Sequence, residues 1–140
     1  MEMKSIQQNQ DKRHEIGRLG EDIAVIYLKN KGFEVVGRNY RKKYGEIDVI
    51  AQKGKITHFI EVKSVSHENF QENVSRVTDN YRPEDNIHPQ KLKRLARTIQ
   101  AYLLEKFPVN EPIWEFHAIT VQINLATRRA RVRFLENLIL

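Results

Sequence analysis

Cysteine is absent from the 140 residues of this sequence. Its absence excludes disulfide bonds, thiolate nucleophiles and zinc sites with cysteine ligands. The five histidines are scattered along the chain and lack the spacing that is typical of a metal site. A chain without disulfides suits a reducing compartment, so we expect a cytoplasmic protein.

Long apolar runs and a glycine-rich phosphate loop are missing as well. Residues 1–13 are polar and rich in glutamine, which is typical of neither a secretory signal nor a membrane span, so we expect no membrane partner. We interpret these residues as a flexible N-terminal segment. Residues 14–140 have the length of one domain, and the hydrophobic content of 40% is enough for one core.

Positive charge is in excess and is unevenly distributed. The sequence has 24 lysine and arginine residues against 18 aspartate and glutamate residues, a net charge of +6. Basic residues cluster within the stretches 29–43, 91–106 and 128–133. Such clusters neutralise phosphates in nucleic-acid-binding proteins, but a basic, solvated surface explains the charge alone equally well.

Hydrophobic periodicity predicts two helices and five strands. Apolar residues at steps of three and four predict a helix over 14–31, and Gly32 is a typical helix stop. A second helix is predicted from Pro89 to just before Pro108. The predicted strands cover residues 33–40, 46–52, 55–63, 113–125 and 130–135. The order α-β-β-β-α-β-β predicts an α/β fold with a mixed sheet flanked by helices.

The polar segment 64–88 has no clear period, which predicts a long loop. Loops of this length in compact domains are often functional, so we expect a substrate-facing flap. A second connection, Lys53-Gly54, is predicted to be a two-residue hairpin turn. That turn would place Asp48 opposite Phe59 and make Glu61 its diagonal neighbour, roughly 7 Å away at the backbone.

Charged residues interrupt the two strands that this turn joins. Because side chains alternate along a strand, Glu46 and Asp48 should share one face, with Ile47 and Val49 on the other. An acid among apolar strand residues carries a desolvation penalty unless it is neutralised or binds a ligand. The strand therefore indicates a functional site.

The following strand repeats this pattern, because Glu61 and Lys63 should share a face opposite Ile60 and Val62. Carboxylate oxygens bind hard cations such as Mg²⁺ or Mn²⁺, which in phosphodiester hydrolysis generate hydroxide and stabilise negative charge. We therefore interpret Asp48, Glu61 and Lys63 as catalytic candidates, with Lys63 orienting water or countering charge. A Glu and a Lys two residues apart are also commonly an exposed ion pair, so this tripeptide alone is weak evidence.

Four motifs together are more specific, and they lie between Gly17 and about Val132. They are Gly17-Arg18-Leu19-Gly20-Glu21-Asp22-Ile23-Ala24, Arg38-Asn39-Tyr40, Gly45-Glu46-Ile47-Asp48 and Ile60-Glu61-Val62-Lys63. They resemble the YraN-like family of uncharacterised endonuclease-like proteins in the PD-(D/E)xK nuclease superfamily, whose fold relatives include Holliday-junction resolvases. The resemblance implies a restriction-endonuclease-like core and metal-dependent cleavage of DNA, including branched or structured DNA.

The resemblance also implies roles for individual residues. The implied metal ligands are Asp48, Glu61, the backbone carbonyl of Val62, and Glu21, although Glu21 can equally be a surface acid of the first helix. The nucleic-acid-binding candidates are Arg41, Lys42, Lys43, Lys91 and Arg94. For Glu46, a place in the site and a structural ion pair are both open. A homodimer is implied too, and the apolar end Leu138–Leu140 would cover a core edge or contact a partner.

Departures from the family pattern leave alternatives open. An arginine that often follows the Glu-Val-Lys strand is Val65 here, which removes one phosphate contact. His117 stands where the family usually has aspartate, and it can equally be a core histidine. A nucleic-acid-binding module that keeps the fold without cleaving is therefore the alternative function, and RNA stays open as a substrate.

Overall fold

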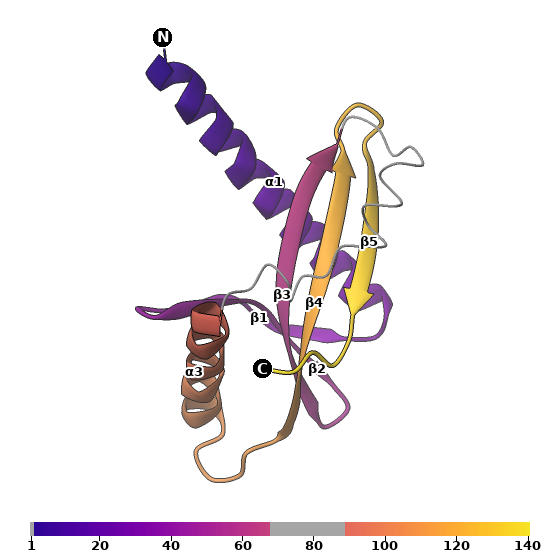
Figure 1. Ribbon diagram of the computed structural model, residues 1–140. Coiled ribbons are helices and arrows are strands. Elements are labelled where there is room, and N and C mark those ends of the chain that lie inside the picture. The colour runs from indigo at the N-terminus through magenta and orange to yellow at the C-terminus, as the bar shows by residue number, and fades with distance from the viewer. Residues whose placement is uncertain (1, 68–88) are drawn as a thin grey trace.

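The computed structural model describes residues 2–67 and 89–140, which form two helices and five strands (Figure 1). The helices are α1 (Glu2–Asn30) and α3 (Pro89–Lys106). The strands are β1 (Glu34–Lys42), β2 (Gly45–Lys53), β3 (Ile56–His67), β4 (Ile113–Asn124) and β5 (Arg129–Leu135). This order confirms the predicted α/β fold and is consistent with a restriction-endonuclease-like core.

The strands form one mixed sheet in the order β1-β2-β3-β4-β5. Strands β3 and β4 are parallel, and the other neighbouring pairs are antiparallel. Parallel neighbours need a long crossover, and α3 lies in the connection between them. The mixed sheet predicted from the element order is therefore confirmed.

A helix packs against each face of the sheet because the central strands are apolar on both sides (Figure 1). Helix α1 buries Ala24 and Leu28 against a cluster that includes Val49 and Ile60. Helix α3 buries an apolar stripe, Leu95, Ile99, Tyr102 and Leu103, against Ile47, Ile50, Phe59 and Phe116. Strand β2, which carries Asp48, thus has α1 on one face and α3 on the other.

The predicted register of the β2–β3 hairpin is wrong. The turn is formed by Gly54 and Lys55, one residue later than predicted, and Ile50 rather than Asp48 lies opposite Phe59. Gly54 has a φ of 63°, a left-handed conformation that glycine adopts without a steric penalty. Both turns contain two residues, so Asp48 and Glu61 still lie on one side as predicted, where they line the same cavity.

The predicted faces of β2 also need one correction. Ile47 packs on the α3 side, whereas Val49 packs on the α1 side, so the two do not share a face. Strand β1 has a left-handed residue, Asn39 with a φ of 52°, across from Asp48, and this position is missing from the β1–β2 pairing. We attribute the break in the alternation of side chains along β2 to a local twist of the two paired strands at this point.

Helix α1 begins at Glu2, not at residue 14 as predicted, and Gly32 with a φ of 92° follows its end as expected. Flexibility of residues 1–13 stays a prediction. No helix in residues 2–67 and 89–140 has the long apolar stretch that crossing a membrane requires.

The prediction that residues 64–67 belong to a loop is wrong, because strand β3 continues through His67. The pattern missed them because their pairing with β4, rather than their polar composition, holds them in the sheet. The remainder of the predicted flap, residues 68–88, lies outside the described residues.

The C-terminal segment lies against the α3-side core. The backbone N–H of Leu138 donates to the carbonyl of Phe116 at 2.8 Å, and the Leu138 side chain packs on that cluster. Leu138 therefore covers a core edge, one of its two predicted roles. Ile139 is exposed, and a homodimer stays a prediction.

Two glycines of α1 provide a test of the helix–sheet contact. A Cβ atom at buried Gly20 would overlap Ser64 of β3, lying 2.6 Å from its Cβ, whereas one at exposed Gly17 would meet nothing within 4 Å. We expect Gly20→Ala to lower the free energy of unfolding by about 1–3 kcal/mol through overpacking. Gly17→Ala should raise it by about 0.5–1 kcal/mol because alanine favours helix.

Urea denaturation of both variants measures these changes. Ser64→Gly combined with Gly20→Ala removes the overlap and should restore part of the lost stability. If Gly20→Ala and Gly17→Ala changed the free energy of unfolding equally, the close approach of α1 to β3 would be contradicted.

Candidate active site

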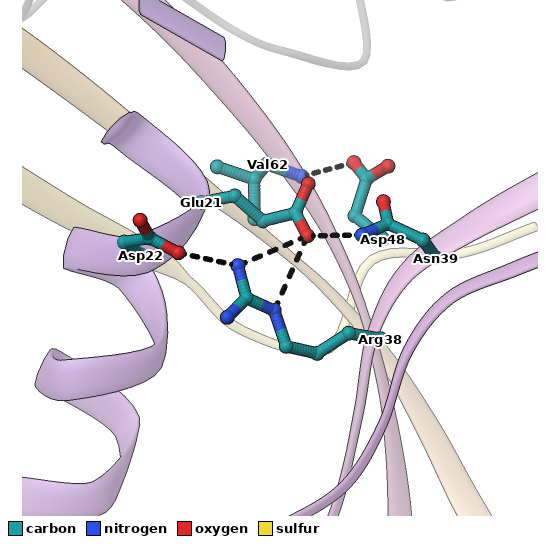
Figure 2. Close-up of polar contacts among 6 residues, drawn as sticks. All are labelled: Glu21, Asp22, Arg38, Asn39, Asp48 and Val62. Carbon is teal, nitrogen blue, oxygen red and sulfur yellow. Dashed lines mark hydrogen bonds and ion pairs between the residues drawn. The ribbon is translucent and has the colours of Figure 1, made fainter. Parts of the chain in front are cut away.

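Asp48 lies where the pairing of β2 with β3 ends. The last paired residues are Val49 and Ile60. Beyond them, the backbone N–H of Val62 donates to Oδ2 of Asp48 at 2.8 Å (Figure 2). The carboxylate thus takes the hydrogen bond that a strand carbonyl would accept, which holds it at the opening between the strands.

The Val62 carbonyl is oriented toward the same opening, because the N–H and C=O of one strand residue point to the same side. This is the position that the predicted backbone metal ligand requires.

A cavity of about 350 Å³ opens on the α3 side of this position. Its lining residues are Tyr44, Gly45, Glu46, Asp48, Glu61, Lys91, Arg94 and Leu95. The structure therefore brings Asp48 and Glu61 into one cavity, as the pattern of β2 and β3 predicted. Acidic residues of the strands and basic residues of α3 line it together.

Glu21 reaches the same region from α1, with only 14% of its side chain exposed. Its Oε1 accepts a hydrogen bond from the Asn39 amide at 2.8 Å, and Arg38 approaches the same oxygen at 3.3 Å (Figure 2). Arg38 also forms an ion pair with Asp22 at 2.6 Å. Residues of the Arg-Asn motif thus hold the acid of the helix motif in place, near enough for its charge to act on Asp48.

The acids around Asp48 make it an unusual carboxyl group. The pKa of Asp48 is raised from 3.8 to about 7, mainly by burial and also by the charges of Glu61, Glu21 and Glu46, although the Val62 hydrogen bond lowers it. Near neutral pH, the group is close to the point where it binds or releases a proton. A cation in the opening would favour its charged form.

Glu46 combines both of its open roles. It lines the cavity with Asp48, and its Oε2 lies 3.0 Å from Nη2 of Arg41. The ion pair therefore places Arg41, a nucleic-acid-binding candidate, at the rim of the cavity.

The other basic candidates divide into two groups. Lys91 and Arg94 line the cavity, and Nζ of Lys91 lies 2.8 Å from Oε1 of Glu61. Lys42 instead pairs with Glu105 near the end of α3, and exposed Lys43 does not line the cavity. The cavity therefore gathers some of the predicted cations and leaves others outside.

Lys63 is exposed on the α3 side of β3 and does not line the cavity. Among the described residues it has no ion-pair partner, whereas its neighbour on the same face, Glu61, is paired with Lys91. An internal Glu61–Lys63 pair, the simple structural explanation of the tripeptide, is therefore not formed.

A second group of candidate ligands was missed by the sequence reasoning. The ligand atoms of His58, Glu115 and His117 all lie within 4.8 Å of one another, so by distance they could hold a metal ion. The parallel register of β3 and β4 brings them together from residues far apart in the chain. No local spacing signals such a cluster, which is why the histidines looked scattered.

Both ring nitrogens of His117 have hydrogen-bond partners without an ion. The Asn137 N–H donates to Nδ1 of His117 at 3.0 Å, so the neutral ring carries its proton on Nε2, 2.8 Å from Nδ1 of His58. Burial lowers the pKa of His117 to about 4 and also lowers that of His58, which keeps both rings neutral. A metal on Nε2 would need the proton moved to Nδ1, against the Asn137 N–H.

Comparison with known proteins identifies relatives without a stated activity. The model of the uncharacterised protein family UPF0102 matches residues 20–134. A UPF0102 protein of Campylobacter fetus is 34% identical over 127 residues, which cover 90% of this chain and 95% of the relative. One from Campylobacter lari is 43% identical over 89 residues, covering 64% and 69%, respectively. One from Wolinella succinogenes is 38% identical over 90 residues, covering 64% and 71%.

The raised pKa of Asp48 predicts a pH-dependent stability in the absence of metal. Asp48 binds its proton more tightly in the folded than in the unfolded state, so the free energy of unfolding of the protein falls as pH rises from 3.8 toward 7. Asp48→Asn removes this loss, so relative to the parent it should gain about 2–4 kcal/mol on going from pH 4 to pH 8.

Urea denaturation in a chelating buffer at the two pH values measures the difference. Asp11→Asn, at an exposed position of α1, is the control and should leave the pH dependence as in the parent. If the free energies of unfolding of the parent and of Asp48→Asn differ by the same amount at both pH values, the pKa of Asp48 is not raised in the folded protein.

Proposed function

Because this chain belongs to the uncharacterised protein family UPF0102, we propose from its own site that it is a metal-dependent endonuclease that hydrolyses phosphodiester bonds in DNA. The observation that carries the proposal is that Asp48 and Glu61 line one cavity beside cations of α3. Glu21 lies outside the lining of that cavity but close enough for its charge to raise the pKa of Asp48. We further propose that it acts in the cytoplasm and as a homodimer.

The acidic residues fit a hard divalent cation such as Mg²⁺ or Mn²⁺. The side-chain donors are carboxylate oxygens, and burial together with the nearby negative charges raises the pKa of Asp48 where no cation balances them. Asp48, Glu61 and the Val62 carbonyl would hold the ion, with Glu21 beside them. When bound, it supplies a hydroxide nucleophile at neutral pH and positive charge for the phosphate.

The chain's own residues perform the remaining tasks. The Val62 N–H keeps the Asp48 carboxylate in the opening, and Asn39 and Arg38 hold Glu21 near it. Exposed Lys63, on the same face as Glu61, can approach a bound phosphate from the solvent side and counter the charge that develops on it.

Nucleic acid fits the basic wall of the cavity. Lys91 and Arg94 are one helical turn apart on α3, and Arg97 continues this row with its guanidinium 4.0 Å from the centre of the Tyr44 ring. Cations in a row beside a carboxylate site can contact consecutive phosphates while the acids face the bond to be cut. DNA, in particular branched or structured DNA, is the proposed substrate.

Two observations favour the alternative function, a nucleic-acid-binding module that does not cleave. Lys63 does not line the cavity, and the Lys91 ammonium forms an ion pair with Glu61. A chain that kept this arrangement in the presence of metal would bind DNA through its basic residues without catalysis.

Metal binding is the first test of the proposal. Calorimetric titration of the protein with Mn²⁺ should show binding that Asp48→Ala weakens more than about tenfold, since even residues that only orient ligands have effects of this size. His58→Gln changes the other cluster and should leave the affinity as in the parent. Loss of binding in His58→Gln instead of Asp48→Ala would move the metal to the histidines.

Cleavage is the second test. With Mn²⁺, the parent should cut at least one substrate among linear duplex, single-stranded and four-way-junction DNA, and Asp48→Ala should reduce the rate at least about 100-fold. Lys63→Met should also slow cleavage while leaving Mn²⁺ affinity unchanged. Lys55→Met, an exposed lysine in the β2–β3 turn, is the matched control and should cut like the parent.

The pattern of outcomes separates the two functions. Cleavage that persists in Asp48→Ala would identify a contaminating nuclease. Salt-sensitive DNA binding without cleavage of any substrate would favour the binding module.

A further inference from the structure

The ion pair between Lys91 and Glu61 occupies an atom that a metal would need. Nζ of Lys91 lies 2.8 Å from Oε1 of Glu61, inside the cavity that Asp48 also lines. The Glu61 side chain is only 18% exposed, whereas that of Lys91 is 55% exposed. The carboxylate is thus fixed in the site, while the ammonium reaches it on a flexible stem from the helix surface.

We propose that Lys91 is an exchangeable counter-ion of Glu61: it leaves the carboxylate when a divalent cation binds there, and its ammonium then binds a phosphate of the DNA. This inference rests on the proposed metal site. It adds to that site an order of events in which metal binding makes the phosphate-binding cation available.

Electrostatics favours the exchange. A divalent cation on Glu61 would stand within a few ångströms of the ammonium in a half-buried site, where repulsion between them is weakly screened. The exposed stem of Lys91 can move without repacking the core, since buried Leu95 and Ile99 anchor α3 independently. A partly exposed ion pair is also weak enough to be displaced.

The geometry places the released ammonium beside the substrate. Arg94, one turn further along α3, lines the same cavity. A phosphate bound near the acids would have Arg94 on one side and would attract the Lys91 ammonium in place of the carboxylate. Lys91 would then contribute to DNA affinity only when metal is present.

Calorimetric titration with Mn²⁺ tests the first half of the exchange. Lys91→Met should bind Mn²⁺ about three- to tenfold more tightly than the parent, because no ion pair has to be broken. Arg94→Met removes a charge of the same cavity that has no ion pair with Glu61, and should give a clearly smaller gain. Lys91→Arg keeps the charge and should stay close to the parent.

DNA binding tests the second half. A fluorescent duplex is titrated with protein in a chelator and in Ca²⁺, and cleavage products are checked by gel. Lys91→Met should weaken binding about three- to tenfold in Ca²⁺ and have little effect in the chelator. Arg94→Met should weaken binding in both conditions.

The results distinguish failure of the exchange from failure of the proposed function. If the parent binds Mn²⁺ through Asp48 but Lys91→Met binds no more tightly than Arg94→Met, the exchange is wrong and the metal site stands. An equal effect of Lys91→Met on DNA binding with and without Ca²⁺ overturns the phosphate step. If neither the parent nor Lys91→Met binds Mn²⁺, the metal site is wrong and the exchange with it.

Discussion

The hydrogen bond from the Val62 amide to the Asp48 carboxylate holds the acid where the β2–β3 ladder ends. In an uninterrupted ladder, a backbone carbonyl would accept that N–H and the two strands would close over the position. Because a side chain accepts it instead, the strands stay apart and a buried carboxylate faces the opening. The place of Asp48 in the cavity, and with it the burial that raises its pKa, follows from this hydrogen bond.

The site is a balance of charges supplied by different elements. Strands β2 and β3 contribute the carboxylates, α1 adds Glu21, and α3 supplies Lys91 and Arg94. Each acid near the opening apart from Asp48 has a cationic partner: Arg38 for Glu21, Arg41 for Glu46 and Lys91 for Glu61. Asp48 has a backbone hydrogen bond instead, and burial raises its pKa, so an added cation would stabilise its charged form.

Two clusters of possible metal ligands lie on the same sheet, and their hydrogen bonds separate them. One hydrogen bond joins the neutral rings of His58 and His117, and the backbone N–H of Asn137 donates to the remaining nitrogen of His117. That cluster needs no cation to balance its charge, which fits the interpretation of His117 as a core histidine. The carboxylates around Asp48 repel one another, so a cation stabilises them.

The sequence by itself determined the order of the elements, the limits of α3, and the two strands on which Asp48 and Glu61 interrupt apolar residues, because periodicity and chemical type are local properties. The tertiary structure decided the rest. A left-handed glycine moved the hairpin turn by one residue and with it the register, and pairing with β4 extended β3 into polar residues. Lys91 on Glu61, Asn39 on Glu21 and His58 on His117 join residues far apart in the chain, and such contacts depend on register and packing that no local pattern encodes.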